Sequence, residues 1–162
     1  MTKEEFTALA ESHMGTVYRV AHNYVKTGPD ADDVTQNVML RLYRAAPRFE
    51  SGEHARRWLI RAAVNESKRL LAAPWRRRTV ELERAEALPA PEGGSAGLLE
   101  AVRALPQKYR LPLYLFYYEG YKVEEIAAIL DRNPSTVQTQ LARGRHRLKE
   151  ILTQEEEHEA AL

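Results

Sequence analysis

The sequence predicts an all-α protein of two small helical modules joined by a flexible linker, the second with a helix-turn-helix. Three observations indicate this. Apolar residues recur at three- and four-residue steps, the period of an amphipathic helix, along most of the chain. Three of the eight prolines and three of the eight glycines fall together in 74–97. Near the C-terminus, a short apolar segment, a tight turn and a longer segment with polar residues follow one another.

The first module is predicted over 1–72, as a bundle of three helices. Its first helix covers 3–26 and is expected to end at the Thr-Gly-Pro sequence of 27–29. Asp30 is then expected to cap the second helix, and Pro47 to stop it.

The third helix, predicted over 54–72, begins a strongly basic stretch. Eight basic residues lie in 56–78 against one acid, Glu66, and four more lie in 143–149 with no acid. The net charge of the whole chain is only +1, so the basic residues are concentrated in two separate patches. Two patches indicate a polyanion contacted at two places, whereas for either patch alone a solvated helix face is an equal alternative.

A linker is predicted over 73–97, where prolines, glycines and alternating charges replace the helical pattern. The second module is predicted over 98–153, and an acidic tail over 154–162. The helices of this module are expected at 98–105, 107–119, 123–130 and 134–153.

The last two of these helices have the layout of a helix-turn-helix. Asn133 is a favourable N-cap for the final helix, and Pro134 occupies the favoured first helical position. In a helix-turn-helix the start of the second helix enters the major groove, so its first residues should form hydrogen bonds and its later ones hold phosphates. The start of this helix is polar and its continuation basic: Ser135, Thr136, Gln138, Thr139, Gln140, Arg143, Arg145, Arg147 and Lys149.

Several classes of protein are disfavoured by what the sequence lacks. It has no cysteine, its five histidines are scattered, and it has no glycine-rich phosphate loop or HExxH motif, so we expect no enzyme, no catalytic residue, no metal site and no cofactor. No apolar run approaches the length of a membrane span, and the N-terminus does not resemble a signal peptide. We therefore expect a cytoplasmic protein without membrane insertion.

The whole pattern resembles a sigma factor of the sigma-70 family, of the extracytoplasmic-function type. Three motifs carry the resemblance, in the order and at the spacing of the family: DADDVTQNVMLRLYR, FESGEHARRWLIRAAVNESKRLL and GYKVEEIAAILDRNPSTVQTQLARGRHRLKE. The resemblance implies that the first module binds core RNA polymerase and opens the −10 element, and that the second module holds the −35 element. It also implies two polymerase contacts, with the clamp helices of the largest subunit and with the flap.

The resemblance assigns polymerase binding to the second helix, whose carboxylates and amides suit a basic coiled coil. Asn37 stands where the family usually has Glu, and Met39 where it usually has Phe. The residues at the matching positions are Asp32, Asp33, Gln36 and Asn37.

For the −10 element, the resemblance implies a pocket for an unstacked base and cations that hold the backbone. A tryptophan at the position of Trp58 is more often part of a bundle core than a stacking platform. The implied residues are Phe49, Trp58, Arg61, Asn65, Lys68 and Arg69.

For the −35 element, the resemblance places base and phosphate contacts on the final helix. Gln138 stands where many relatives have Lys or Arg, and Lys122 where a Ser or Thr cap is usual. The resemblance implies Gln138, Thr139, Ala142 and Arg143. The helix-turn-helix layout adds Ser135, Thr136 and Arg145 to the residues predicted for this element.

The partners expected are core RNA polymerase, promoter DNA and an anti-sigma factor, the chain being a monomer outside these complexes. The main alternative is a polymerase-independent helix-turn-helix regulator, a dimer that reads a palindromic site. That function would leave the acidic second helix without a purpose. An enzyme and a bundle that only binds other proteins are further alternatives.

Overall fold

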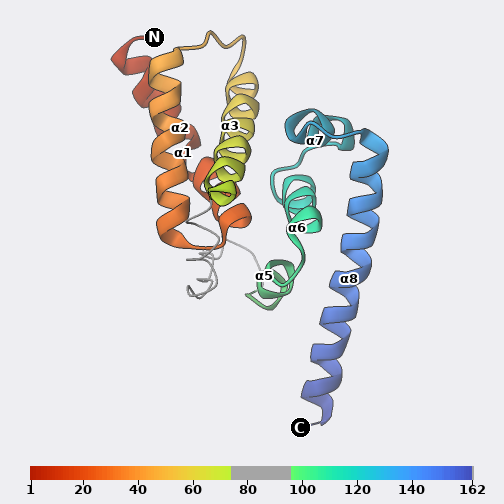
Figure 1. Cartoon of the computed structure of the whole chain (residues 1–162). Helices are drawn as coiled ribbons and strands as arrows, with labels where there is room; N and C mark the ends of the chain where they lie inside the picture. Colours follow the sequence, from red (N-terminus) through yellow and green to blue (C-terminus); the bar gives the residue numbers. More distant parts are fainter. Residues whose placement is uncertain (74–95, 162) are drawn as a thin grey trace. The chain divides into compact units, whose positions relative to one another are not determined.

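The computed structural model describes residues 1–73 and 96–161, and within these ranges all regular secondary structure is helical (Figure 1). The chain divides into two compact units, Met1–Glu86 and Ala87–Leu162. The prediction of an all-α fold with two modules is therefore confirmed. The predicted linker lies, apart from its ends, outside the described residues.

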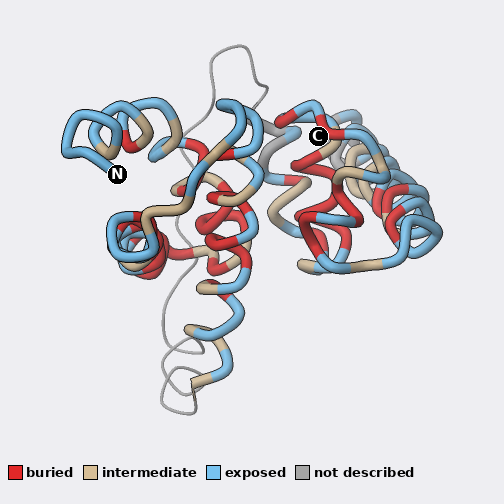
Figure 2. The backbone as a smooth tube through the Cα atoms, turned by 90° about the horizontal axis from the view of Figure 1, so that it is seen from above, coloured by how far each residue is buried: buried red, intermediate tan, exposed pale blue. Residues whose placement is uncertain are grey.

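The N-terminal unit is a bundle of three helices, α1 (Lys3–Val25), α2 (Gly28–Ala45) and α3 (Gly52–Ala72). Each helix packs against the other two. Their inward faces form a continuous apolar core, which Figure 2 shows as buried segments facing one another. Among the residues with almost no exposed surface are Val17, Val20, Val34, Leu42, Leu59 and Ile60.

The connection between α1 and α2 differs from the prediction that Asp30 caps the second helix. Thr27 is the N-cap, and its hydroxyl oxygen accepts a hydrogen bond from the Asp30 N–H at 3.4 Å. Pro29 lies in the first turn of α2, where a fixed φ and a missing N–H favour a helix start. The chain leaves α1 at Lys26, whose φ of 69° is left-handed.

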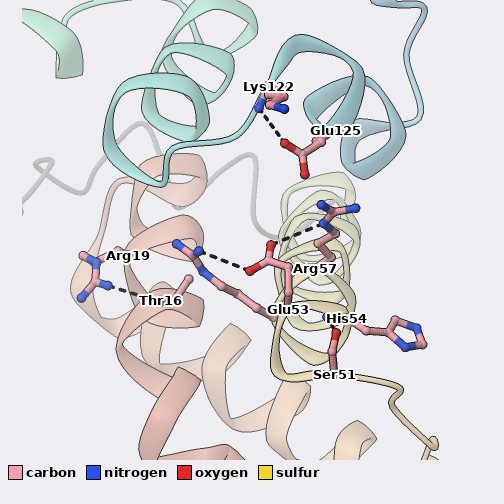
Figure 3. Close-up of polar contacts among 9 residues, drawn as sticks. Thr16, Arg19, Ser51, Glu53, His54, Arg57, Lys122 and Glu125 are labelled. Atoms are coloured by element: carbon pink, nitrogen blue, oxygen red, sulfur yellow. Dashed lines mark hydrogen bonds and ion pairs between the residues drawn. The ribbon is translucent and has the colours of Figure 1, made fainter.

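The other ends in this unit lie close to their predicted positions. The second helix finishes at Ala45, two residues before Pro47, and Ala46 has the left-handed φ of 43°. The third helix begins at Gly52, two residues earlier than predicted, because the Ser51 hydroxyl caps it. Ser51 Oγ accepts from the His54 N–H at 3.0 Å (Figure 3).

The C-terminal unit contains α5 (Ala96–Arg103), α6 (Gln107–Leu113), the π-helical turn η1 (Tyr114–Tyr118), α7 (Val123–Leu130) and α8 (Pro134–Ala161). The long helix α8 packs against α5, α6 and α7. Buried segments of these helices form the core of the C-terminal unit (Figure 2). Its fully buried side chains include Leu105, Leu111, Leu115, Ile126 and Leu141.

Two predicted helices of this unit have different lengths. The predicted helix 107–119 is divided, because the backbone widens after Leu113 into a π-turn that the Glu119 N–H closes on the Tyr114 carbonyl at 3.2 Å. The final helix continues to Ala161 rather than ending near residue 153, so the acidic tail is helical as far as it is described. Glutamate and alanine favour helices, and no proline or glycine follows Gly144 to stop this one.

In the described parts of the chain, no helix is both long enough and apolar enough to cross a membrane.

Candidate functional site

The outer surface of α2 combines acidic and apolar side chains. Asp32, Asp33 and Gln36 are exposed, and one turn further along, Leu40 and Tyr43 are 50% and 63% exposed. These five residues are called the α2 face below. Large apolar side chains exposed next to one another are typical of a surface that binds another protein.

A hollow of about 660 Å³ runs along the α2 face toward α1. Its α1 wall is formed by Phe6 and Met14, and the Phe6 ring meets the Tyr43 ring edge-on at 5.5 Å. Met39, the departure from the family pattern, is buried and forms the base of the hollow on the α2 side. The lining residues are Phe6, Met14, Asp32, Thr35, Gln36, Met39, Leu40 and Tyr43.

Asn37, the fourth residue predicted to bind polymerase, is half-buried and turned toward α3. Its Nδ2 donates to Glu66 Oε1 at 3.0 Å. Glu66 also accepts hydrogen bonds from Arg69, which was predicted to hold DNA. One residue from each predicted site is therefore bound to the same carboxylate, a residue that the sequence did not single out for function.

Four of the residues predicted for the −10 element share one exposed face of α3. Arg61, Asn65, Lys68 and Arg69 are all exposed and follow one another at helical steps of four, three and one. Three of the four are cations. This face can therefore hold a polyanion, and Asn65 supplies a side chain that both donates and accepts hydrogen bonds.

The other two, Phe49 and Trp58, form an aromatic cluster with His54 at the start of α3. The Phe49 ring lies edge-on to His54 at 5.3 Å and to Trp58 at 5.9 Å, and both Phe49 and Trp58 are half-buried. His54 fixes the preceding loop, because its Nδ1 accepts from the Glu50 N–H at 3.1 Å. His54 was not predicted to belong to the site, although its position four residues before Trp58 puts the two side chains on one helix face.

The start of α8 carries the residues predicted for the −35 element. Ser135, Thr136 and Gln138 are exposed in its first turns, and Asn133 caps the helix by accepting from the Ser135 N–H at 3.1 Å. Thr139 is exposed too, but its hydroxyl donates to the Ser135 carbonyl at 3.0 Å.

A hollow of about 320 Å³ joins this part of α8 to α6. Lys108 was not singled out from the sequence, since it lies 27 residues before Ser135, but it extends the same surface. Its Nζ lies 5.0 Å from the Tyr109 ring centre, and Arg147 lies 5.2 Å from the same ring. The lining residues are Lys108, Tyr109, Ser135, Thr136, Thr139, Gln140 and Arg143.

Ala142 is exposed one turn further along α8, but Arg145 has a different setting. Arg145 Nη1 donates to the Tyr117 hydroxyl at 3.0 Å. Arg145 and Tyr117 line a mostly apolar groove of about 560 Å³ between α5, η1 and the second half of α8. This groove is called the C-terminal groove below. Its lining residues are Leu98, Val102, Leu113, Tyr114, Tyr117, Tyr118, Arg145, Leu148, Lys149, Leu152, Thr153 and Glu156.

Comparison with protein families finds two matches, one in each unit. Residues 9–77 match Sigma-70 region 2, and residues 95–148 match Sigma-70, region 4. The first match contains the α2 face and the cationic face of α3, and the second contains α5 to α7 and the first half of α8.

Similar proteins are found over nearly the full length of the chain. The chain is 28% identical to RNA polymerase sigma factor SigV of Bacillus subtilis (strain 168), over 96% of this chain and 95% of that one. It is also 28% identical to the ECF RNA polymerase sigma-E factor of Escherichia coli (strain K12), over 88% of this chain and 84% of that one. Among solved structures, the sigma factor RpoE in complex with the anti-sigma factor NepR from Bartonella quintana has a similar fold, with a TM-score of 0.73 at 21% identity, covering 93% of this chain and 98% of that one.

Proposed function

Because this chain belongs to the sigma-70 family, as an extracytoplasmic-function RNA polymerase sigma factor, we propose that its four surfaces divide polymerase binding and promoter recognition between them. As a sigma factor it directs promoter-specific initiation of transcription, and sigma factors are not enzymes. The observation that carries the division is that each unit has one surface with apolar side chains and one surface with polar and cationic side chains.

We propose that polymerase binds at the α2 face and at the C-terminal groove. The clamp helices of the largest subunit would lie on the α2 face, where Asp32, Asp33 and Gln36 offer charges and hydrogen bonds to a basic coiled coil. Leu40 and Tyr43 would add buried apolar area. The C-terminal groove would accept an apolar segment of the flap. Arg145 would hold Tyr117 in the wall of this groove through their hydrogen bond.

The cationic face of α3 would meet the −10 element. Arg61 and Lys68 suit phosphates, and Asn65 suits the edge of an unpaired base. The Phe49, His54 and Trp58 cluster lies at the other end of the same helix, where aromatic rings could receive a base that has left the stack.

The start of α8 would read the −35 element in the major groove. Ser135, Thr136 and Gln138 supply hydrogen bonds to base edges, and Arg143 and Lys108 supply charge on either side of the hollow between α6 and α8. Thr139 and Ala142 complete the surface toward the DNA. Because Lys108 comes from α6, phosphate contacts would be made from two helices.

We propose that the chain works in the cytoplasm, where RNA polymerase acts, and is a monomer outside its complexes. The solved relative is bound to an anti-sigma factor. This supports an anti-sigma factor as a further partner for this chain, which would compete with polymerase for the apolar surfaces.

The first test of this division concerns polymerase binding. The chain is added to core RNA polymerase, and affinity and initiation on a promoter library are measured. Asp33→Arg places a cation against a basic partner and should weaken binding to core by more than about tenfold. Glu11→Arg makes the same change of charge on exposed α1 and should change binding less than about twofold. Equal affinities for the two variants would contradict the α2 assignment.

The second test separates DNA contacts from the C-terminal groove. Arg143→Ala should weaken binding of the holoenzyme to −35 DNA by about tenfold, without changing its affinity for core. Arg145→Ala, two positions along the same helix, should weaken core binding instead. If the free chain bound specific DNA with no initiation when core was present, the polymerase-independent regulator would be the correct function.

A further inference from the structure

The carboxylate of Glu66 connects the helix that carries the α2 face to the cationic face of α3. Across 29 residues of sequence, Asn37 Nδ2 donates to its Oε1 at 3.0 Å. Within α3, Arg69 Nε donates to Oε1 at 3.1 Å and to Oε2 at 3.2 Å, and Arg69 Nη2 also forms an ion pair with Oε1. The Glu66 side chain is 13% exposed, whereas that of Arg69 is 69% exposed.

The charge of Glu66 is compensated by these neighbours. The hydrogen bond from Arg69 lowers the pKa of Glu66 more than burial raises it, and the Asn37 bond and the charges of Arg69 and Arg41 lower it further. The pKa of Arg69 is raised in return, because Glu66 accepts its hydrogen bonds and lies beside it. The carboxylate and the guanidinium therefore form a pair without net charge.

Asn37 is chemically matched to this carboxylate. A primary amide has two N–H donors and one acceptor oxygen, so its bond to Glu66 leaves an N–H and the oxygen for a partner protein. The glutamate usual in the family at position 37 would instead bring a second carboxylate to within hydrogen-bond distance of Glu66, and two like charges so close repel. In this chain, an amide at position 37 therefore suits the acid at position 66 better than a carboxylate would.

We infer that Glu66 is a positioning residue, which orients Asn37 for polymerase docking and holds Arg69 as a neutral pair at the promoter-facing edge of α3. This inference rests on the proposed function of the two surfaces, with Asn37 added to the α2 residues that meet polymerase. The pairing with Glu66 also changes what Arg69 can offer to DNA. With Nε and one N–H of Nη2 committed to Glu66, the remaining N–H groups can still donate to a nucleotide, but the pair adds no net positive charge against the phosphates.

A double-mutant cycle on core polymerase tests the link to Asn37. Asn37→Glu should weaken binding of the chain to core by about tenfold, and Glu66→Gln alone by less than about threefold. In the double variant, the amide introduced at position 66 can donate to the new carboxylate, so affinity should return to within about threefold of wild type. Thermal unfolding of each variant separates loss of binding from loss of structure.

The control for this cycle is Glu53→Gln, which removes another α3 carboxylate, paired with Arg57 at 3.4 Å and lying in the first turn of the helix, about 20 Å along α3 from Glu66. It should not rescue Asn37→Glu. If Asn37→Glu caused the same loss with and without Glu66→Gln, the inference would be wrong. If wild type failed to bind core at all, the proposed function itself would fail, so the two failures are distinguishable.

The salt dependence of promoter binding by the holoenzyme tests the neutral pair. Each phosphate that a cation neutralises contributes about 0.9 to the slope of log K against log salt for duplex DNA and about 0.7 for single strands. Arg69→Ala leaves the Glu66 carboxylate unpaired, so it should make the slope shallower. Glu66→Gln should steepen it by about one phosphate, and adding Arg69→Ala to Glu66→Gln should return it to the wild-type value. An unchanged slope in Glu66→Gln would overturn the inference.

Discussion

Gly144 is the residue through which α8 approaches α6. A Cβ added at this buried glycine would lie 2.9 Å from Leu113 Cδ1, 3.2 Å from Tyr109 Cβ and 3.3 Å from Leu113 Cγ. The Leu113 methyl group could rotate away, but Tyr109 Cβ is fixed to the backbone of α6. The glycine therefore allows the close packing that puts Lys108 and the start of α8 on one surface.

We expect Gly144→Ala to destabilise the C-terminal unit. Overpacking costs about 1–3 kcal/mol, and the better helix propensity of alanine offsets about 1 kcal/mol, so a net loss should remain. Gly15→Ala is the matched control, since its Cβ would meet only the end of the Arg19 side chain, at 3.2 Å. It should stabilise α1 by about 0.5–1 kcal/mol. Hydrogen exchange of amides in α8 and α1 reports each change separately, and a more stable α8 in Gly144→Ala would contradict the packing argument.

Acid titration should show that Arg69 lowers the pKa of the Glu66 carboxyl group. The folded-state pKa of Glu66 lies below its ordinary value of 4.5, because of the Arg69 hydrogen bond first and despite burial. The stabilisation from this group is therefore fully present above pH 4.5, and is lost as the pH falls through the lower folded-state pKa. Carboxyl chemical shifts measured by NMR should show this pKa rising toward 4.5 in Arg69→Ala. An unchanged Glu66 pKa in that variant would mean that Arg69 does not hold the carboxylate.

At the scale of single elements, the first turn of α8 depends on one side chain. Asn133 Oδ1 accepts from the Ser135 N–H at 3.1 Å and from the Ser135 hydroxyl at 3.0 Å. Asn133→Ala should therefore cost about 1 kcal/mol of stability in this unit, and loosen the residues proposed to read the −35 element. Asn133→Ser keeps a capping oxygen and should retain most of the stability. Thermal unfolding and −35 DNA affinity, measured on both variants, check the expectation. Wild-type stability in Asn133→Ala would show that the cap is unimportant.

The helices themselves could be predicted from the sequence because their apolar period is a local property. The structure gives α7 the predicted bounds, Val123–Leu130. The prediction failed where two neighbouring residues could each cap a helix. Both Thr27 and Asp30 can be an N-cap, and the structure has Thr27 in that position. The π-turn at Tyr114–Tyr118 also escaped prediction, since it depends on how aromatic side chains pack around it rather than on a periodic pattern.

The candidate sites were less predictable than the elements, because their geometry depends on contacts between helices. A family position indicated Asn37 and positive charge indicated Arg69, but only the folded bundle shows that Glu66 binds both. Likewise, spacing along α8 placed Arg145 with Arg143, whereas the π-turn brings Tyr117 to Arg145. Local sequence therefore indicated which surfaces are exposed, and tertiary packing decides which partner each residue meets.

At the scale of the whole molecule, positive charge is concentrated in two patches although the net charge is small. The net charge is +1, and the cations that suit DNA lie in two separate units. Neither unit needs high affinity alone, because binding both to one polymerase raises the effective concentration of the second at its DNA element. The affinity of the holoenzyme for a promoter should then depend on the distance between the two elements, which the polymerase sets.

This dependence gives a prediction for the assembled complex. Inserting about five base pairs between the −35 and −10 elements turns one element by half a helical turn, and should lower initiation by roughly a hundredfold, the scale of avidity lost when one unit cannot engage. The same insertion upstream of the −35 element should have no effect. An insertion of about ten base pairs restores the helical face but not the distance, so initiation should stay low if the polymerase holds both units rigidly. Recovery of initiation with a full turn would instead mean that the second unit can follow its element along the DNA, and that the polymerase does not fix the spacing.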